Sequence, residues 1–255
     1  MTHTTLGSIL RSNQAYCGQL CERHTLDLGV AFVCERFSAL PEVNQYREVI
    51  LPPGRRAEEA FAEAESFFAG RGLTCHRWAP AEGRRIDELG AFLSARGFDE
   101  IEYVCLTLSR WVHLNPAPQV RILPARAMRG AYEATFGDAS EAQAAGVARL
   151  DDASLDAFVA LQAGRPAGRI ALHQVGDIGR IIEPEIVGGT DEASVERALL
   201  AHVLALAQRL QMRTICLPLA VEREERLARF KAAGFEVDGR VIEYHRETEG
   251  VGRAR

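Results

Sequence analysis

The sequence has 255 residues, of which 47% are hydrophobic and 25% are charged, and its formal net charge is −5 at pH 7. This length allows one large domain or two domains of about 100 to 150 residues. The acidic balance gives no support for a nucleic-acid partner, and no apolar run reaches the roughly 18 residues of a membrane-spanning helix. The N-terminus lacks a basic stretch followed by an apolar core, so we expect no signal peptide and a cytoplasmic location.

The first half of the chain alternates helices with strands. Apolar residues at helical spacing predict a core-facing helix over residues 6–24, with Cys17 and Cys21 on one face. No two of the six cysteines form a Cys-x-x-Cys pair, so we expect neither a metal site nor a disulfide framework. Further helices are predicted over 57–70 and 85–96, and strands over 30–36, 44–51, 73–78 and 101–108.

The second half follows a segment with two prolines and no periodicity, residues 111–119, which predicts a linker. Hydrophobic patterns then predict a strand over 120–123, a helix over 127–136, a hairpin of 155–161 with 167–175, and a strand over 178–187. Pro184 lies inside the last of these strands and cannot donate a ladder hydrogen bond. It therefore predicts a bulge or a splayed strand pair.

Residues 183–235 have the clearest organisation in the chain. They read as a strand with a Gly-Gly turn (EPEIVGG), a long amphipathic helix (TDEASVERALLAHVLALAQRLQ), a buried strand (TICLPLA) and a short helix ending in Gly-Phe (REERLARFKAAGF). This order resembles the second half of the GNAT acetyltransferase superfamily. The resemblance implies a mixed α/β (α+β) sheet across which acyl-coenzyme A lies, at the strand and the start of the long helix.

The two halves also resemble each other. Each has a helix, a strand, a second helix ending in Gly-Phe (SARGF and KAAGF) and a final strand, which favours duplication over coincidence. We therefore predict two GNAT-like modules in tandem. Their boundaries are residues 1–110 for a degenerate first module, 111–119 for the linker, 120–247 for the second module and 248–255 for a tail.

The resemblance also implies roles for individual residues. In this family, backbone amides at a helix start hold the pyrophosphate, and a strand amide holds the thioester oxygen. The corresponding positions here, expected to bind acetyl-coenzyme A or another acyl-coenzyme A, are Val187, Gly188, Gly189, Ser194 and Arg223. Glu183 and Glu185 lie on the strand that lines the acceptor cleft, so they are the candidate general bases, with His173 as a further candidate.

Several positions depart from the family pattern. The loop pattern Arg/Gln-x-x-Gly-x-Gly/Ala falls on Asp191, Ser194 and Glu196, none of which matches. The carboxylates near this helix start suit the helix dipole but repel a pyrophosphate. The tyrosine that often protonates the departing thiolate is replaced by Phe230. Two further expectations are that Arg223, Arg226 and Arg229 form a solvated helix face, and that the basic turn at 52–56 is a weaker second site.

These features lead to a main hypothesis with two alternatives. The main hypothesis is an N-acyltransferase that moves an acetyl or other acyl group from acyl-coenzyme A to a small-molecule or peptide amine. The first alternative is a non-catalytic GNAT-like module for binding or dimerisation that has lost acyl-coenzyme A. The second is a transferase that takes an amino acid from transfer RNA, which the net charge of −5 disfavours. A homodimer is left open.

Overall fold

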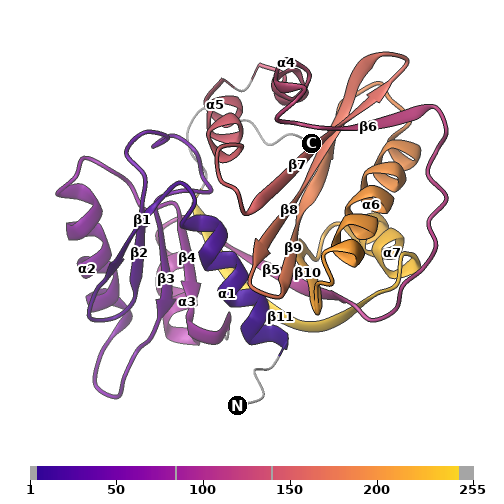
Figure 1. Cartoon of the computed structure of the whole chain (residues 1–255). Helices are drawn as coiled ribbons and strands as arrows, with labels where there is room; N and C mark the ends of the chain where they lie inside the picture. The colour runs from indigo at the N-terminus through magenta and orange to yellow at the C-terminus, as the bar shows by residue number, and fades with distance from the viewer. Residues whose placement is uncertain (1–4, 84, 139, 247–255) are drawn as a thin grey trace. The chain divides into compact units, whose positions relative to one another are not determined.

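The computed structural model describes residues 5–83, 85–138 and 140–246, so the predicted tail lies outside it (Figure 1). Its helices are α1 (Thr5–Cys17), α2 (Ala57–Ala69), α3 (Asp87–Ser94), α4 (Arg129–Glu133), α5 (Ser140–Arg149), α6 (Glu192–Arg209) and α7 (Glu224–Ala232), with 3-10 helices η1 (Ala81–Gly83) and η2 (Ala134–Phe136). Its strands are β1 (Glu22–Thr25), β2 (Val30–Val33), β3 (Gln45–Val49), β4 (Arg77–Pro80), β5 (Phe98–Leu108), β6 (Val120–Pro124), β7 (Leu155–Gln162), β8 (Arg165–Val175), β9 (Ile178–Ile186), β10 (Thr214–Ala220) and β11 (Phe235–Arg246).

These strands are hydrogen-bonded in the order β1-β2-β3-β4-β11 in one part of the structure and β5-β10-β9-β8-β7-β6 in the other, and both parts mix parallel with antiparallel pairs. The described chain divides into two compact units. The N-terminal unit comprises residues 13–104 and 239–246, and the C-terminal unit comprises residues 5–12 and 105–238. Strand β11 pairs with β4 in the N-terminal unit, whereas β5 lies beside β10 in the C-terminal unit. The two halves of the sequence therefore exchange their final strands.

Most of the predicted elements are confirmed, and β10 has the bounds expected from the sequence. The helix predicted over residues 6–24 is too long, because the chain turns after Cys17 and residues 22–25 form β1 against β2. Cys21 is therefore not part of the helix. The sequence also fails to predict α5, whose Ala-rich residues have little periodicity. Its place depends on packing, since a Cβ on Gly146 would lie 2.3 Å from the Phe136 ring.

In the N-terminal unit, one face of the sheet packs against α2 and α3. Tyr46, Trp78 and Tyr244 lie side by side on β3, β4 and β11, and all three are fully buried. They belong to one core cluster, which includes Ala60, Ala64 and Phe68 of α2 and Leu89 and Leu93 of α3. Because side chains alternate along a strand, the neighbours of these aromatic residues point to the opposite face of the sheet.

That opposite face carries a buried ion pair between β3 and β11. The Arg47 guanidinium lies 2.6 Å from the Glu243 carboxylate, and the two side chains are 7% and 9% exposed. Arg47 also donates to Gln45, and His245 lies 3.1 Å from Glu243. Burial opposes the charge on Glu243, but Arg47 and His245 hold the pKa of this carboxyl well below its usual value. The pair ties the exchanged strand β11 to the N-terminal unit.

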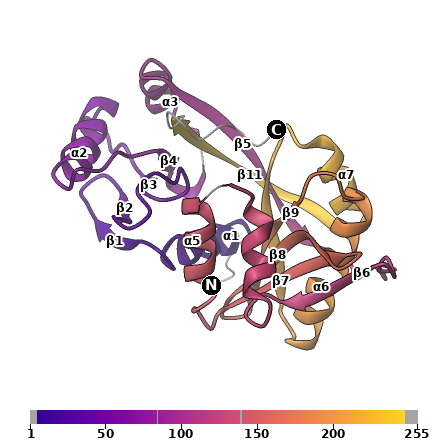
Figure 2. The same cartoon turned by 90° about the horizontal axis from the view of Figure 1, so that it is seen from above.

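In the C-terminal unit, helices lie on both sides of strands β7–β9. Figures 1 and 2 show α5 on one side of these strands, and α6 and α7 on the other. Helix α6 packs along β6–β9. Its buried stripe recurs every three or four residues, as expected for a helix with one face on a sheet, and includes Val195, Leu199, Val203 and Ala207.

The Gly-Phe ending that marks both halves has a shared backbone cause. Gly97 and Gly234 each come just after a helix and have a positive φ, 79° and 98° respectively. Residues with a Cβ adopt this conformation only at a cost in free energy. Gly234 also approaches the carbonyl oxygen of Arg110 so closely that a Cβ would lie 2.2 Å from it. The modules at residues 1–110 and 120–247 stay a prediction, and the exchange of final strands gives the compact units different boundaries.

Candidate functional site

Strands β9 and β10 of the C-terminal unit are paired only at their beginnings and then separate. They pair in parallel only over residues 178–180 and 214–216. Strand β9 nevertheless continues to Ile186 and β10 to Ala220. Among the described residues, the facing edges beyond this short ladder therefore have no pairing between the two strands.

A bulge lies on β9 in the separated part. Arg169 of β8 pairs with Glu185, and Ala171 pairs with Ile182, so two residues of β9 lie opposite one residue of β8. One of the two is Pro184, which has no N–H to donate to the ladder. The expectation of a bulge or splayed pair at Pro184 is confirmed.

The corresponding strands of the N-terminal unit do not separate in this way. Strands β3 and β4 pair in parallel from Gln45 with Arg77 to Val49 with Pro80, which are the last residues of both strands. An interval of irregular register lies between, at residues 47–48. The opening between parallel strands is thus a feature of the C-terminal unit.

At the basic turn before α2, glutamate side chains of the protein occupy the backbone N–H groups. The N–H of Ala57 donates to Glu88 at 3.0 Å, and the N–H of Arg56 donates to Glu59 at 3.2 Å. The guanidinium of Arg55 forms an ion pair with the same Glu59 at 2.8 Å. Carboxylates therefore occupy the donors that would face a phosphate at this helix start.

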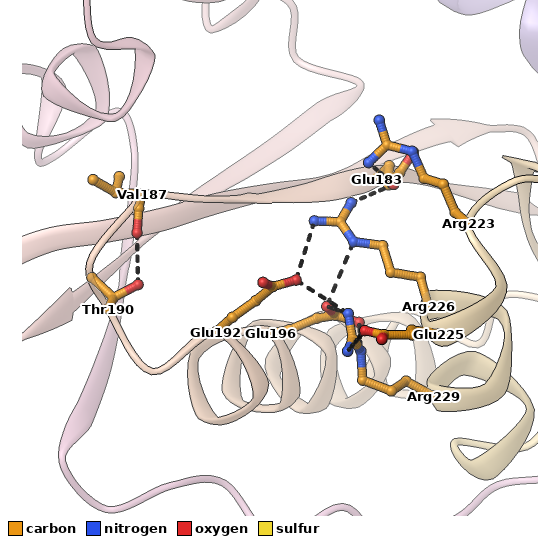
Figure 3. Close-up of polar contacts among 9 residues, drawn as sticks. All are labelled: Glu183, Val187, Thr190, Glu192, Glu196, Arg223, Glu225, Arg226 and Arg229. Atoms are coloured by element: carbon orange, nitrogen blue, oxygen red, sulfur yellow. Dashed lines mark hydrogen bonds and ion pairs between the residues drawn. The ribbon is translucent and has the colours of Figure 1, made fainter. Parts of the chain in front are cut away.

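After β9 the chain makes an exposed turn into α6. The N–H of Val187 donates to Ala167 at 2.9 Å, and its carbonyl accepts from the Thr190 hydroxyl at 2.7 Å (Figure 3). Neither Gly188 nor Gly189 donates its N–H to a described residue, and a Cβ on either would meet no atom within 4 Å. Of the three predicted turn residues, the two glycines thus keep their amides available to a ligand.

The side chain of Asp191, the residue just before α6, caps the first turn of this helix. Asp191 accepts a hydrogen bond from the N–H of Ser194 at 3.2 Å, and hydrogen bonds from the side chain and the backbone of Ser194 lower the pKa of Asp191. The amide of Ser194, which the sequence places among the cofactor-binding groups, is therefore already engaged. The N–H groups of the preceding Gly-Gly turn have no such partner among the described residues.

A cluster of arginine and glutamate side chains lies next to this turn, and we call it the α6–α7 ion cluster (Figure 3). At its centre is Arg226, whose side chain is 14% exposed. Arg226 donates a hydrogen bond to Glu183 on β9. Its guanidinium also lies 3.9 Å from Glu192 and 3.8 Å from Glu196, both on α6. One side chain of α7 thus links the start of α6 to the separated part of β9.

Two more arginines complete the α6–α7 ion cluster. Arg229 lies 3.2 Å from Glu192 and 3.0 Å from Glu196, and Arg223 lies 3.2 Å from Glu183. The expectation of a solvated helix face is therefore wrong for Arg226 and Arg229. The cause is complementary spacing, because glutamates four residues apart on α6 face arginines three residues apart on α7. This complementarity is the signal in the sequence that could have indicated the cluster.

Comparison with known proteins places this geometry in a fold. No protein-family model and no curated protein matches the sequence. A GCN5-related N-acetyltransferase from Kribbella flavida matches the structure with a TM-score of 0.68 at 12% identity, over 100% of this chain and 98% of that one. The chain has the GNAT fold. The prediction of a mixed α/β sheet of the GNAT type is confirmed.

Two further solved structures extend the comparison. A tandem GNAT protein from the clavulanic acid biosynthesis pathway matches with a TM-score of 0.56 at 15% identity, over 88% of this chain and 80% of that one. A conserved protein of unknown function from Staphylococcus epidermidis matches with a TM-score of 0.65 at 11% identity, over 89% and 94% of the two chains. Within the described residues, no helix is long and apolar enough to cross a membrane.

The two glutamates predicted as general bases have different surroundings. Glu183 faces two guanidiniums, those of Arg223 and Arg226, within the α6–α7 ion cluster. Glu185 is 63% exposed and pairs at 2.9 Å with Arg169. The same arginine donates to the carbonyl of Thr135 at 2.7 Å, which links β8 to η2. Glu185 is therefore the more accessible carboxylate, while Glu183 is committed to the cluster.

Two other candidate positions do not face a ligand. Phe230, at the position of the family's tyrosine, is fully buried and packs edge to face on Phe235 at 5.6 Å between ring centres. His173 is 3% exposed, so it does not reach an amine in solution. Burial and the nearby charge of Arg180 lower the pKa of His173 to about 4.

Proposed function

We propose that the chain is an N-acyltransferase that moves an acetyl or other acyl group from acyl-coenzyme A to an amine, and that its C-terminal unit holds the acyl-coenzyme A. The acceptor class stays as broad as the sequence leaves it, a small-molecule or peptide amine. All six cysteines are free and buried, which fits the reducing conditions of the cytoplasm. Homodimer formation is not needed for this reaction.

The observation that carries the proposal is the separation of β9 from β10, with the Pro184 bulge and the open Gly188-Gly189 turn at its end. An extended thioester ligand needs unpaired strand edges beside it, and its phosphates need free backbone amides. The C-terminal unit offers both features. The N-terminal unit offers neither, since β3 and β4 stay paired to their ends and Glu88 occupies the start of α2.

The chemistry asked of the protein is mainly positioning. The amine nitrogen attacks the thioester carbonyl carbon, the carbon–sulfur bond breaks, and the thiolate departs. We propose Glu185 as the carboxylate that takes the amine proton, because it is exposed on β9 beside the bulge. Phe230 has no proton to donate, so the thiolate is protonated from solvent in this scheme. The amides of Gly188 and Gly189 would face the phosphates, with Arg223 at the rim of the site.

A second function is supported by a specific observation. Glu183, Val187 and Ser194 all have partners within the chain, as a site that no longer binds acyl-coenzyme A would show. A non-catalytic GNAT-like binding or dimerisation module would keep the fold and the ion cluster. This alternative predicts that neither acetyl-coenzyme A nor free coenzyme A stabilises the protein.

A thermal-shift titration with acetyl-coenzyme A and coenzyme A tests the proposal. Ligand at about 100 times its dissociation constant stabilises a native protein by about 2.7 kcal/mol. We expect this stabilisation for the wild-type chain and its loss in Gly188→Glu. This substitution enters open space and adds one negative charge beside the turn.

Arg55→Gln is the matched control, because it changes the net charge by the same amount at the turn before α2. We expect it to keep the ligand response. A response that disappears in Arg55→Gln and persists in Gly188→Glu would move the site to the N-terminal unit. The absence of any response in the wild-type chain would favour the binding module.

A further inference from the structure

The α6–α7 ion cluster contains a ready-made position for an anion. A single oxygen of Glu192 lies 3.2 Å from the Arg229 guanidinium and 3.9 Å from that of Arg226. Guanidiniums that converge on one oxygen are typical of carboxylate and phosphate recognition. Glu192 belongs to the first turn of α6, which follows the open Gly-Gly turn, so this position lies where the strand-to-helix connection meets α7 (Figure 3).

The carboxylates of the cluster differ in how firmly they are held. Glu196 is 3% exposed and is enclosed between α6 and α7, whereas Glu192 is 54% exposed. An exposed carboxylate can turn into water at little cost, since a solvent-exposed ion pair contributes little to stability. Glu196 would continue to hold Arg229 after such a movement. The cluster can therefore release Glu192 without leaving its buried charges unpaired.

The balance of charge shows why a release is needed. Glu183, Glu192, Glu196 and Glu225 face Arg223, Arg226 and Arg229, which leaves no surplus positive charge for a ligand. An incoming phosphate would meet Glu192 at close range and would be repelled while that carboxylate stays in place. Binding of an anion here is consequently an exchange of partners.

We propose that Arg226 and Arg229 bind the pyrophosphate of the ligand, taking over the role of the absent loop pattern, and that Glu192 holds their place until the ligand displaces it. The proposal rests on the proposed function, and it assigns the anion site to side chains of α7. Gly188 and Gly189 would add backbone donors on the other side of the same anion.

Isothermal titration of the full chain with coenzyme A, pantetheine and inorganic pyrophosphate tests this assignment. Glu192→Gln removes the competing charge, so we expect about fivefold tighter binding of coenzyme A and of pyrophosphate. Arg229→Gln, at a partly exposed position, is expected to weaken both by about tenfold or more. Pantetheine has no phosphate, and its affinity is expected to be the same in both variants.

Glu236→Gln is the matched control, because it makes the same change of charge at an exposed position outside the cluster, and it should leave all three affinities unchanged. If wild type binds coenzyme A but Glu192→Gln and Arg229→Gln bind it with wild-type affinity, the assignment is wrong while the proposed function stands. If coenzyme A binds to no variant and pyrophosphate still follows the predicted pattern, the anion site stands and the proposed function is wrong. Failure of both ligands in every variant overturns both.

Discussion

Side chains of the same type differ in this protein in their exposure and in the charges that they face. Glu185 and Glu183 are two residues apart on one strand, yet one is largely exposed and the other faces two guanidiniums. Arg226 lies on α7, a helix with many charged residues, yet its side chain is mostly buried between two glutamates of another helix. The residue types are visible in the sequence, whereas the partner of each charge depends on which helix face meets which.

At the residue scale, His173 predicts a pH dependence of stability. Its pKa is lowered to about 4 by burial and by Arg180, whereas an unfolded histidine titrates near pH 6.5. Below that pH the unfolded chain takes up a proton that the folded chain refuses, so the folded state loses stability as the pH falls from about 6.5 to 4. The expected loss between pH 7.5 and 4.5 is about 2 to 3 kcal/mol.

Denaturant titrations of wild type and His173→Gln at several pH values measure this pH-dependent change in the free energy of unfolding. The buried His76 and the half-buried His202 and His245 also have lowered pKa values, so they contribute in the same direction in both proteins. The difference between the two pH profiles isolates His173. Parallel profiles, or an imidazole that titrates near pH 6.5 by NMR, would show that His173 is not held neutral by the fold.

At the scale of single elements, the ends of helices and strands decide the geometry of the site. The bulge at Pro184 and the early end of the β9–β10 ladder open one strand pair, while β3 and β4 stay closed. A proline in a strand is readable in the sequence, and its consequence is local because it follows from a missing donor. The capping of α2 by Glu88 of α3 cannot be read from the sequence, because Glu88 lies 31 positions along the chain from its partner Ala57.

The two Gly-Phe helix ends provide a matched stability prediction. Gly97→Ala places a Cβ in open space at φ 79°, so it should cost about 1 to 2 kcal/mol from backbone conformation alone. Gly234→Ala has the same backbone penalty and an added clash with the Arg110 carbonyl, so it should cost about 3 kcal/mol or more. Urea unfolding of the two variants measures both costs. Equal costs would mean that the Arg110 segment moves away freely.

At the scale of the whole molecule, the exchange of final strands makes each unit depend on residues from the other half of the sequence. Strand β11 follows the second-half helix α7 but completes the core beside Trp78 through Tyr244. Chain order alone would predict that each module keeps its own last strand. The pairing actually found depends on buried contacts that form between residues nearly 200 positions apart.

The Arg47–Glu243 pair tests this dependence. Glu243→Leu leaves Arg47 buried without its carboxylate, which should cost about 3 to 5 kcal/mol. The double variant Arg47→Met with Glu243→Leu removes both charges and should be far less destabilised. Hydrogen exchange should show the loss of protection in β3 and β4 of the N-terminal unit. A loss confined to the C-terminal unit, or a double variant as unstable as the single one, would contradict this role of the pair.

The sequence by itself determined the order of elements, the GNAT-like fold class, the bulge at Pro184 and the open Gly188-Gly189 turn. The order of elements, the bulge and the turn follow from local properties, namely hydrophobic period, a missing N–H and the absence of a Cβ, whereas the fold class follows from the resemblance to the GNAT superfamily. Only the tertiary structure decided that β5 and β11 change places, that α5 is a helix, and that Arg226 and Arg229 face Glu192 and Glu196. Each of these depends on contacts between distant segments, and their free energy becomes available only when the two surfaces are packed together.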